Sequence, residues 1–462
     1  MDIRERILGI FDEASFVEID AFLQSRQSTS DDSAKGDGVL SGYGTINGRL
    51  VYMAAQDRNF LGGAWGEIHA SKIARAINMA VSVGAPVFLV FDSQGARLKE
   101  GLLALNGYGE IMQAVSNASG MVPVISVCCG NAYGLTSYAL EMADFVIMTD
   151  NGRMAVTTPA VIKASDKNAG DEVGNANFNE KVSGNADLVC TDAELPYILR
   201  KLVSLLPDNN LTGAPQVECT DDLNRSLDIN TDDLDIRNWL LQIADIDSYF
   251  ELKQNYATEI ITAFIRLNGR VVGTVANNGL LTGEAMSKAA RFVRFCDTFN
   301  IPVLTLTNAE GFVKNQEEEE NGIVRNAAKL AHAFAGCTVP KVNVVLNKAY
   351  GGAYVLMNSK HLGSDLVYAL ENAVIAPLSD VASAVMLFQD EIATSDDPVK
   401  TREEKAQEYA EKYANPYEAA KLGYVDDIIR PEELRVRVIS AFEMLLGKRK
   451  HSLPRKHINV NL

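Results

Sequence analysis

The amino-acid sequence predicts an α/β protein made of two copies of one domain. Four matched residue pairs support this prediction: Arg49 with Arg270, Pro86 with Pro302, Pro123 with Pro340, and Gly134 with Gly351. The separation along the chain is nearly the same in all four pairs and amounts to almost half of the sequence. A solenoid repeat is much shorter, roughly 20 to 50 residues. Each copy is therefore expected to be a whole domain with its own core, and two domains suit a chain of 462 residues.

Short apolar runs rich in β-branched residues predict the strands. Residues 87–90 and 342–346 are such runs, and longer helical patterns follow them, as expected for parallel strands buried between helices. A proline lies at the entrance to each strand, where its missing N–H need not join the sheet. In the second copy we expect the last strand to end near Leu346 and a helix to begin near Gly352.

A change in composition predicts the domain boundary. Residues 195–240 contain Pro207, Gly213, Pro215 and many acids, and are expected to form the linker between the domains. This places the N-terminal domain, with the start of the linker, at residues 1–235, and the C-terminal domain at residues 236–462.

Composition and charge exclude several functions. The chain is 47% hydrophobic with a net charge of −17, which argues against binding the phosphate backbone of nucleic acids. The N-terminus lacks the apolar core of a signal peptide, and the longest apolar stretch, residues 80–91, is short and contains Pro86. We therefore expect a cytoplasmic protein without membrane insertion. The six cysteines show no CxxC spacing, which indicates buried reduced thiols and no metal site.

Most catalytic signatures are missing from the sequence. There is no GxxxxGK phosphate-binding motif, and residues 42–48 miss the dinucleotide-binding fingerprint by one position. With five histidines and no GxSxG, a serine or cysteine triad has little support. We therefore expect chemistry that needs no general base from the protein.

Glycines at a strand-to-helix turn offer a different kind of site. Gly351 and Gly352 follow an expected strand, at a point where free backbone N–H groups and the positive end of a helix dipole would meet. Such a pair of amides can hold a developing oxyanion. The alternative is that both glycines only permit close helix packing, and the residues alone do not decide between these interpretations.

Five further motifs resemble one known family. They are residues 92–101 (DSQGARLKEG), 107–110 (GYGE), 348–354 (KAYGGAY), 359–362 (SKHL) and 414–420 (ANPYEAA). Together they resemble the carboxyltransferase subunit of biotin-dependent acyl-CoA carboxylases and of the related methylmalonyl-CoA and glutaconyl-CoA decarboxylases. The resemblance runs from Arg4 to His457. It implies two crotonase-like domains, each built of ββα spiral units, in agreement with the duplication.

The resemblance also implies a division of labour between the domains. The N-terminal domain would bind an acyl-CoA and the C-terminal domain biotin, which a separate biotin carboxyl carrier protein would hold. The active site would lie between domains of different subunits in a hexameric trimer of dimers. A biotin carboxylase or a membrane decarboxylase subunit would complete the enzyme. The base would be the biotin nitrogen, which would take the α-proton of the thioester.

Site residues follow from the resemblance by position. The acyl thioester oxyanion would lie on the backbone amides of Gly134 and Leu135, and the biotin ureido oxyanion on those of Gly352 and Ala353. The other implied substrate- or cofactor-binding residues are Ser93, Gly95, Ala96, Arg97, Tyr350, Gly351, Tyr354 and Val355. Arg97 would contact a CoA phosphate or, as the alternative, form an ion pair with Glu100 or Glu110. Val355 would line the acyl pocket, and its apolar side chain favours an unsubstituted or alkyl α-carbon.

The chain departs from the family pattern mainly in its N-terminal half. Leu135 stands where a second glycine is usual, Asn175 interrupts a usual Gly-Gly-Ala, and Asn179 replaces a histidine. Three functions remain open. They are a carboxylase acting on a short acyl-CoA of acetyl or propionyl type, the carboxyltransferase subunit of a sodium-pumping decarboxylase, and a non-catalytic scaffold subunit of a mixed oligomer.

Overall fold

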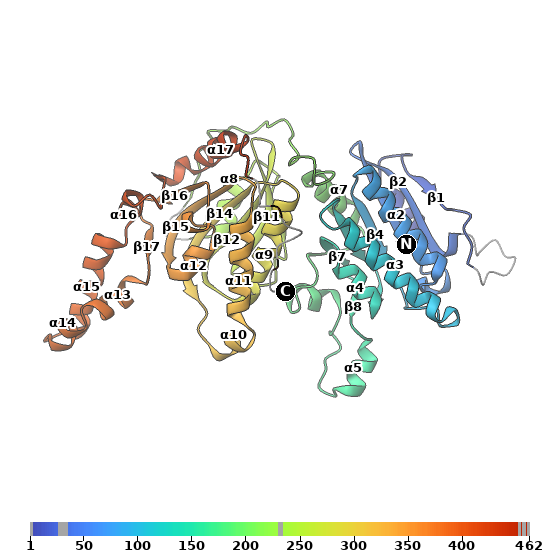
Figure 1. Cartoon of the computed structure of the whole chain (residues 1–462), viewed down its shortest axis with the longest axis horizontal. Helices are drawn as coiled ribbons and strands as arrows, with labels where there is room; N and C mark the ends of the chain where they lie inside the picture. Colours follow the sequence, from blue (N-terminus) through green and yellow to red (C-terminus); the bar gives the residue numbers. More distant parts are fainter. Residues whose placement is uncertain (1–2, 26–35, 230–233, 451–453, 455–458, 460–462) are drawn as a thin grey trace. The chain divides into compact units, whose positions relative to one another are not determined.

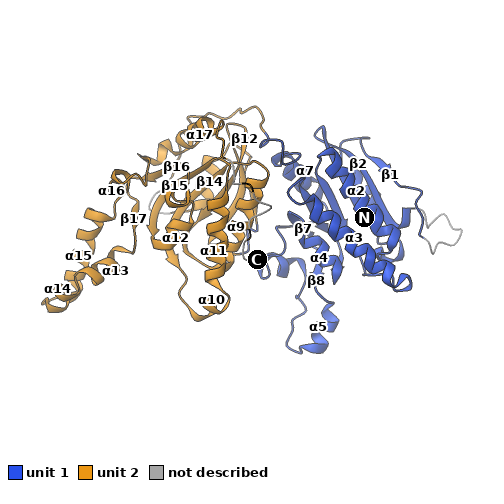
Figure 2. Cartoon of the chain, in the orientation of Figure 1, with its two compact units in different colours: residues 1–215, 253–256 blue, residues 216–252, 257–462 orange. Residues whose placement is uncertain are grey.

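Two compact units make up the chain. The computed structural model describes residues 3–25, 36–229, 234–450, 454 and 459, so the resembling stretch that ends at His457 reaches beyond the described residues. The first unit comprises residues 1–215 with 253–256, and the second comprises residues 216–252 with 257–462 (Figure 2). Each unit contains one large sheet covered by helices, which confirms the predicted α/β class.

Unit 1 is built on a seven-stranded sheet in the order β1-β2-β3-β4-β5-β7-β9, with β6 and β8 paired separately. The strands are β1 (Val17–Ile19), β2 (Val39–Ile46), β3 (Arg49–Gln56), β4 (Val87–Phe91), β5 (Val124–Cys128), β6 (Asn131–Tyr133), β7 (Phe145–Thr149), β8 (Arg153–Ala155) and β9 (Leu188–Cys190). The helices are α1 (Ile3–Leu8), α2 (Glu67–Val83), α3 (Leu102–Ala118), α4 (Leu135–Glu141), α5 (Pro159–Ser165), α6 (Ala176–Lys181) and α7 (Leu195–Leu205). Strands β3, β4, β5, β7 and β9 pair in parallel, and α2 and α3 lie side by side against them (Figure 1).

Unit 2 repeats this plan in the order β10-β11-β12-β14-β15-β16-β18, with β13 added to β14 and β17 added to β15. The strands are β10 (Phe250–Leu252), β11 (Ile260–Leu267), β12 (Arg270–Asn277), β13 (Gly279–Leu281), β14 (Val303–Phe312), β15 (Lys341–Tyr350), β16 (Leu366–Leu370), β17 (Val374–Ala376) and β18 (Asp427–Ile429). The helices are α8 (Ile236–Ile243), α9 (Gly283–Thr298), α10 (Gln316–Glu320), α11 (Ile323–Gly336), α12 (Gly351–Leu356), α13 (Asp380–Leu387), α14 (Gln389–Thr394), α15 (Pro398–Tyr413), α16 (Pro416–Lys421) and α17 (Leu434–Leu445). Helices α9 and α11 pack together as α2 and α3 do (Figure 1).

An Asn-Gly hairpin in unit 1 is held by a polar clamp. Asn47 and Gly48 both have positive φ values, of 51° and 76°, as a two-residue turn between β2 and β3 requires. The carboxylate of Asp12 accepts their N–H groups at 3.0 and 2.9 Å. Arg200 on α7 then donates to Asp12 at 2.8 Å and to the carbonyl oxygen of Ile10 at 2.9 Å. The clamp thereby joins the residues after α1, the hairpin and α7.

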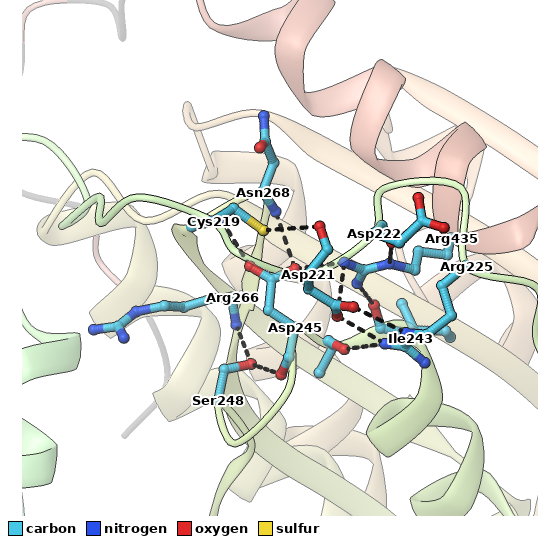
Figure 3. A network of polar contacts seen from close by, with 12 residues as sticks. Cys219, Asp221, Asp222, Arg225, Ile243, Asp245, Ser248, Arg266, Asn268 and Arg435 are labelled. Carbon is cyan, nitrogen blue, oxygen red and sulfur yellow. Dashed lines mark hydrogen bonds and ion pairs between the residues drawn. The ribbon is translucent and has the colours of Figure 1, made fainter.

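The same clamp recurs in unit 2, as Figure 3 shows. The carboxylate of Asp245 accepts the N–H groups of Asn268 at 3.2 Å and Gly269 at 2.7 Å. Arg435 on α17 donates to Asp245 at 2.7 Å and to the carbonyl oxygen of Ile243. The duplication therefore includes the flanking helices, with α1 matching α8 and α7 matching α17, and extends beyond the motifs that revealed it.

The expected linker differs from the structure at both of its ends. Residues 195–205 form α7, whose apolar face is buried by Leu195, Leu199 and Leu202 at helical spacing. At the other end, residues 216–235 belong to unit 2, although we expected them in the N-terminal domain. The reason is that this segment pairs with a hairpin of unit 2, because the N–H of Val217 donates to the carbonyl oxygen of Gly269 at 3.0 Å.

Strand β15 is longer than the sequence predicted. It continues past the expected end at Leu346 as far as Tyr350, and α12 begins at Gly351. Residues 348–350 lie beyond the expected end of the strand, and they remain extended because they pair with β17. The turn from strand to helix is thus sharper than expected, and no loop separates the two elements.

The described residues also bear on the cysteines and on membranes and metals. All six cysteines are free, and five of them are buried as predicted, whereas Cys219 is partly exposed. None of the described helices combines the length and the apolar character needed to cross a membrane. Across the same residues, no three His, Cys, Asp or Glu side chains converge on a possible metal position.

Candidate active site

A sharp turn joins strand β6 to helix α4 in unit 1. Gly134 stands at this turn with a φ of 61°, which glycine adopts without strain. Its N–H donates to the carbonyl oxygens of Ala155 at 3.2 Å and Val156 at 3.1 Å, so it continues the pairing with β8. Leu135 and Thr136 are the first two residues of α4, and their N–H groups have no acceptor within the helix.

The same turn recurs between β15 and α12 in unit 2. Gly351 has a φ of 54°, and a Cβ added to it would lie 2.8 Å from the carbonyl oxygen of Pro377, so only glycine suits this position. Gly352 and Ala353 follow in the first turn of α12, where amides again lack acceptors within the helix. Gly352 is exposed, and its backbone is therefore open to a ligand.

The two turns correspond residue by residue, and this correspondence offers a second candidate for the acyl-side pair of amides. Gly134 and Gly351 are one of the matched pairs, so positions 135 and 136 correspond to positions 352 and 353. The predicted donation from Gly134 to an oxyanion would require its N–H to leave the end of β8, to which it already bonds. Thr136 takes its place as the second candidate donor. Sequence reasoning missed Thr136, although the common spacing of the matched pairs could have identified it.

The segment after β4 lies beside the turn in unit 1. Ala96 forms a parallel bridge with Trp65, whose N–H donates to the carbonyl oxygen of Gly95 at 2.9 Å. The carbonyl oxygen of Trp65 in turn accepts the N–H of Arg97 at 2.8 Å, so Trp65 bonds to both neighbours of Ala96 and the N–H of Ala96 points away from it. The N–H of Ser93 donates to the carbonyl oxygen of Asn131 at 2.7 Å, which holds this segment against β6. The predicted residues of unit 1 are thus brought together.

Two of the predicted binding residues in this segment have structural roles. Ser93 is 1% exposed, and its hydroxyl accepts the N–H of Gly95 at 3.0 Å. The guanidinium of Arg97 lies 2.6 Å from Asp37 and 3.3 Å from Glu100, and its side chain is 6% exposed. The ion pair with Glu100 is therefore confirmed, and the alternative of a CoA phosphate contact is not supported by this buried geometry.

Asn179, which replaces a histidine of the family pattern, is a core residue. It is 1% exposed, and its side chain takes part in five hydrogen bonds. Its side-chain N–H groups contact the carbonyl oxygens of Met154, Gly174 and Asn175, each at 3.0 Å, and its oxygen accepts from Ser183 and Asn185. Because every polar atom of the side chain is satisfied inside the unit, Asn179 ties α6 to β8 and presents nothing to a ligand.

A cavity of about 390 Å³ lies beside α12 in unit 2. Its lining includes the predicted residues Gly351, Tyr354 and Val355, together with His361 and Tyr424. His361 stacks on Tyr424 with 4.4 Å between the ring centroids, which makes the wall aromatic. Tyr354 is 5% exposed, and among the described residues its hydroxyl meets no hydrogen-bond partner. The cavity wall is therefore mainly apolar and aromatic, it also includes His361 and Glu418, and Tyr354 contributes an unsatisfied hydroxyl.

Burial removes the acid–base function of three groups: Tyr350 and Tyr354 in unit 2, and His69 in unit 1. It raises the pKa of both Tyr350 and Tyr354 to about 12, so both hydroxyls stay protonated at neutral pH. Burial lowers the pKa of His69 in unit 1 to about 3, so its ring is neutral. Its two nitrogens contact Gln56 and the carbonyl oxygen of Asp37, both at 2.9 Å, and the ring is not exposed. These groups therefore supply no general base.

Comparison with known proteins assigns this geometry to a family. The model of the carboxyl transferase domain family matches residues 2–460. The chain belongs to the carboxyl transferase family. It is 43% identical to the putative propionyl-CoA carboxylase beta chain of Bacillus subtilis, over 99% of this chain and 93% of that relative. It is 40% identical to the methylmalonyl-CoA decarboxylase subunit alpha of Propionigenium modestum, over 100% of this chain and 93% of that relative.

A solved structure of the same family shares the fold of this carboxyl transferase. It is transcarboxylase 12S, described as a hexamer with methylmalonyl-CoA and methylmalonic acid bound. The TM-score is 0.94 at 39% sequence identity, over 100% of this chain and 92% of that chain. The predicted crotonase-like architecture with two domains is therefore confirmed.

Proposed function

We propose that this carboxyl transferase moves a carboxyl group between biotin on a separate carrier protein and a short acyl-CoA, with propionyl-CoA and methylmalonyl-CoA as the principal pair. The observation that carries the proposal is the repeated strand-to-helix turn, which presents two amides in unit 1 and two in unit 2. The reaction has two carbonyl oxygens that gain negative charge, one on the thioester and one on the ureido ring. Each turn would hold one of them.

The residues of this chain would act through their backbone. The amides of Leu135 and Thr136 would hold the thioester oxygen, and those of Gly352 and Ala353 the ureido oxygen, each worth a few kcal/mol in the transition state. The exposed, side-chain-free backbone at Gly352 fits a bulky ring that must approach closely. Bound biotin would supply the nitrogen that accepts the carboxyl group and exchanges a proton with the α-carbon. This fits a site whose buried tyrosines and histidine supply no base.

The acyl group is inferred from the relatives and from one side chain. Relatives named for propionyl-CoA and methylmalonyl-CoA favour a three-carbon acyl group. Val355 on α12 lines the cavity in unit 2 with an apolar side chain, which suits an unsubstituted or alkyl α-carbon. An acetyl-type substrate is the alternative within the same class, and comparison of malonyl-CoA with methylmalonyl-CoA separates the two.

The assembly is inferred in the same way. The transcarboxylase 12S structure is described as a hexamer, which favours a hexamer, a trimer of dimers, for this chain. Its active site would form between domains of different subunits. The partners would be a biotin carboxyl carrier protein and a biotin carboxylase, in the cytoplasm.

Transfer of a labelled carboxyl group to free biotin tests the proposal. The purified chain is mixed with methylmalonyl-CoA that carries the label in its free carboxyl group. The C–C bond to that group breaks, an N–C bond to biotin forms, and the proton of the biotin nitrogen passes to the α-carbon. Label on biotin together with an equal amount of propionyl-CoA supports the proposal. Tight thioester binding without any transfer would indicate a different reaction on this fold.

Two alternatives share parts of this evidence. A decarboxylase subunit is favoured by the relative from Propionigenium modestum and would catalyse the same half-reaction, so only the partner subunit distinguishes it. A scaffold subunit is favoured by Leu135, where the family usually has glycine. The scaffold predicts that calorimetry detects no acyl-CoA binding to the homo-oligomer.

A further inference from the structure

Each unit contains one residue pair that bridges two neighbouring chain segments at an equivalent place, and the side chains of the two pairs differ in size. Ala96 bridges Trp65 in unit 1, and Phe312 bridges Leu281 in unit 2. The two bridges are separated along the chain by the same stretch that separates Pro86 from Pro302. The preceding glycines, at positions 95 and 311, both have positive φ values, of 110° and 129°. The equivalence of these strand ends therefore rests on pairing and on backbone conformation as well as on spacing.

In unit 2 the large residue of the pair stands on the strand. A Cβ added to Gly352 would lie 3.3 Å from Cε2 and 3.6 Å from Cζ of Phe312. The Phe312 ring thus occupies the space in front of the first turn of α12. A side chain at position 352 would compete with this ring for the same space.

In unit 1 the sizes are reversed. Position 96 is alanine, and position 135, the equivalent of Gly352, is leucine. Both side chains are partly buried against the same apolar core, which includes Trp65 and Tyr108. Trp65 stacks on Tyr108 at 4.2 Å between ring centroids, and the Tyr108 hydroxyl lies 3.2 Å from that of Thr136. These contacts connect the strand end that carries Ala96 to the turn that carries Leu135.

We propose that Leu135 is the residue that limits the size of the acyl group in unit 1. Its side chain fills the space that Phe312 fills in unit 2, and Ala96 leaves that space free for it. The turn therefore keeps its two amides, while the room beside them is reduced from what glycine would leave. Thioesters with a hydrogen or methyl α-substituent fit this space, and those with an ethyl or larger α-substituent are excluded. The substrate named in this inference rests on the proposed function, whereas the exchange of side-chain size between positions 96 and 135 does not depend on that function.

A substrate series tests the specificity. Malonyl-, methylmalonyl- and ethylmalonyl-CoA are compared as carboxyl donors to free biotin in wild type, Leu135→Ala and Leu135→Gly. The ratio of kcat/KM for ethylmalonyl-CoA to that for methylmalonyl-CoA should rise roughly tenfold or more in Leu135→Gly, the scale of one methylene in an apolar pocket. A parallel fall for all three thioesters, or an unchanged ratio, would overturn the inference.

Binding gives the same comparison without turnover. Calorimetry with propionyl-CoA and butyryl-CoA should show butyryl-CoA gaining affinity in Leu135→Gly relative to propionyl-CoA. If wild type transfers no carboxyl group but this shift in affinity appears, the proposed function fails and the inference on Leu135 survives. If transfer occurs and neither ratio shifts, the inference on Leu135 fails alone.

A side-chain exchange tests the packing directly. Ala96→Phe alone should lower the melting temperature, because the ring would meet Leu135, and Ala96→Phe with Leu135→Gly should recover most of the loss. The matched exchange in unit 2 is Gly352→Leu, which should be tolerated better together with Phe312→Ala. A double variant no more stable than Ala96→Phe alone would show that the two side chains do not share one space and would overturn the proposal.

Discussion

Replacing Gly352 by valine tests the biotin-side oxyanion site most directly. Only Gly351 needs the left-handed conformation at this turn, so a side chain at position 352 acts through space and leaves the backbone unstrained. An added Cβ would already lie 3.3 Å from the Phe312 ring, and the two γ-methyls of valine would project into the remaining space over the exposed turn. We expect carboxyl transfer to fall roughly 10²- to 10³-fold, the effect of losing one oxyanion donor. Gly352→Ala, which adds only the tolerable Cβ, should lose less than roughly tenfold by the same reasoning.

The assay is the transfer of label from methylmalonyl-CoA to free biotin, with assembly checked by sedimentation. Gly447→Val is the matched control, because that glycine is exposed in the same unit and a Cβ there meets nothing within 4 Å. The control should retain wild-type transfer. Wild-type turnover in a correctly assembled Gly352→Val variant would refute the assignment of these amides to the ureido oxygen.

Three further predictions concern the carrier, the assembly and pH. An avidin blot of the purified chain should be blank, because biotin would be carried by a separate protein. Sedimentation should give a multiple of 50.2 kDa, with a hexamer expected, and a fully active monomer would exclude a shared site. The hydrogen bond from Gly48, with those from Arg200 and Thr45, holds the pKa of Asp12 well below its ordinary 3.8. The carboxylate therefore stabilises the fold above that ordinary pKa, and this effect is lost as pH falls toward the lowered one. Asp12→Asn should lower the melting temperature at pH 7 more than at pH 3, as thermal scans would show.

The repeat predicted the fold because its anchors lie at points of backbone constraint. Pro86 and Pro302 open equivalent strands, and Gly134 and Gly351 take equivalent positive φ values. Such positions require proline or glycine whatever side chains surround them. The spacing between these residues can therefore reveal the two copies even where the rest of their sequences differ. Architecture and the place of both turns could therefore be predicted from the matched pairs.

Side-chain contacts made over long sequence separation could not be predicted in this way. The residues of α7 were expected in a linker because prolines and acids surround them, although Pro196 in the first turn is compatible with a helix. The packing of α7 depends on Arg200 reaching Asp12, which lies near the start of the chain. Likewise, the sequence makes Arg97 a candidate for contact with a CoA phosphate, because its partner Asp37 lies far away in the chain. Neither partner is marked by a local motif.

The hydrogen bonds of Gly134 bear on how one fold could hold two different ligands. Both copies use a glycine with positive φ to turn the strand. The N–H of Gly134 bonds to the end of β8, so under the proposed function the ligand would meet the amides of the next two residues. Backbone amides hold the oxyanion whatever side chains surround them, which leaves the side chain at position 135 or 352 free to change. Under the proposed function, a glycine at position 352 would keep the backbone open to the biotin ring, whereas a leucine at position 135 would narrow the space beside the thioester to a short acyl chain. Both proposals together imply that the two copies share one pair of backbone amides and differ in ligand selectivity, because a small and a large residue are exchanged across the same contact.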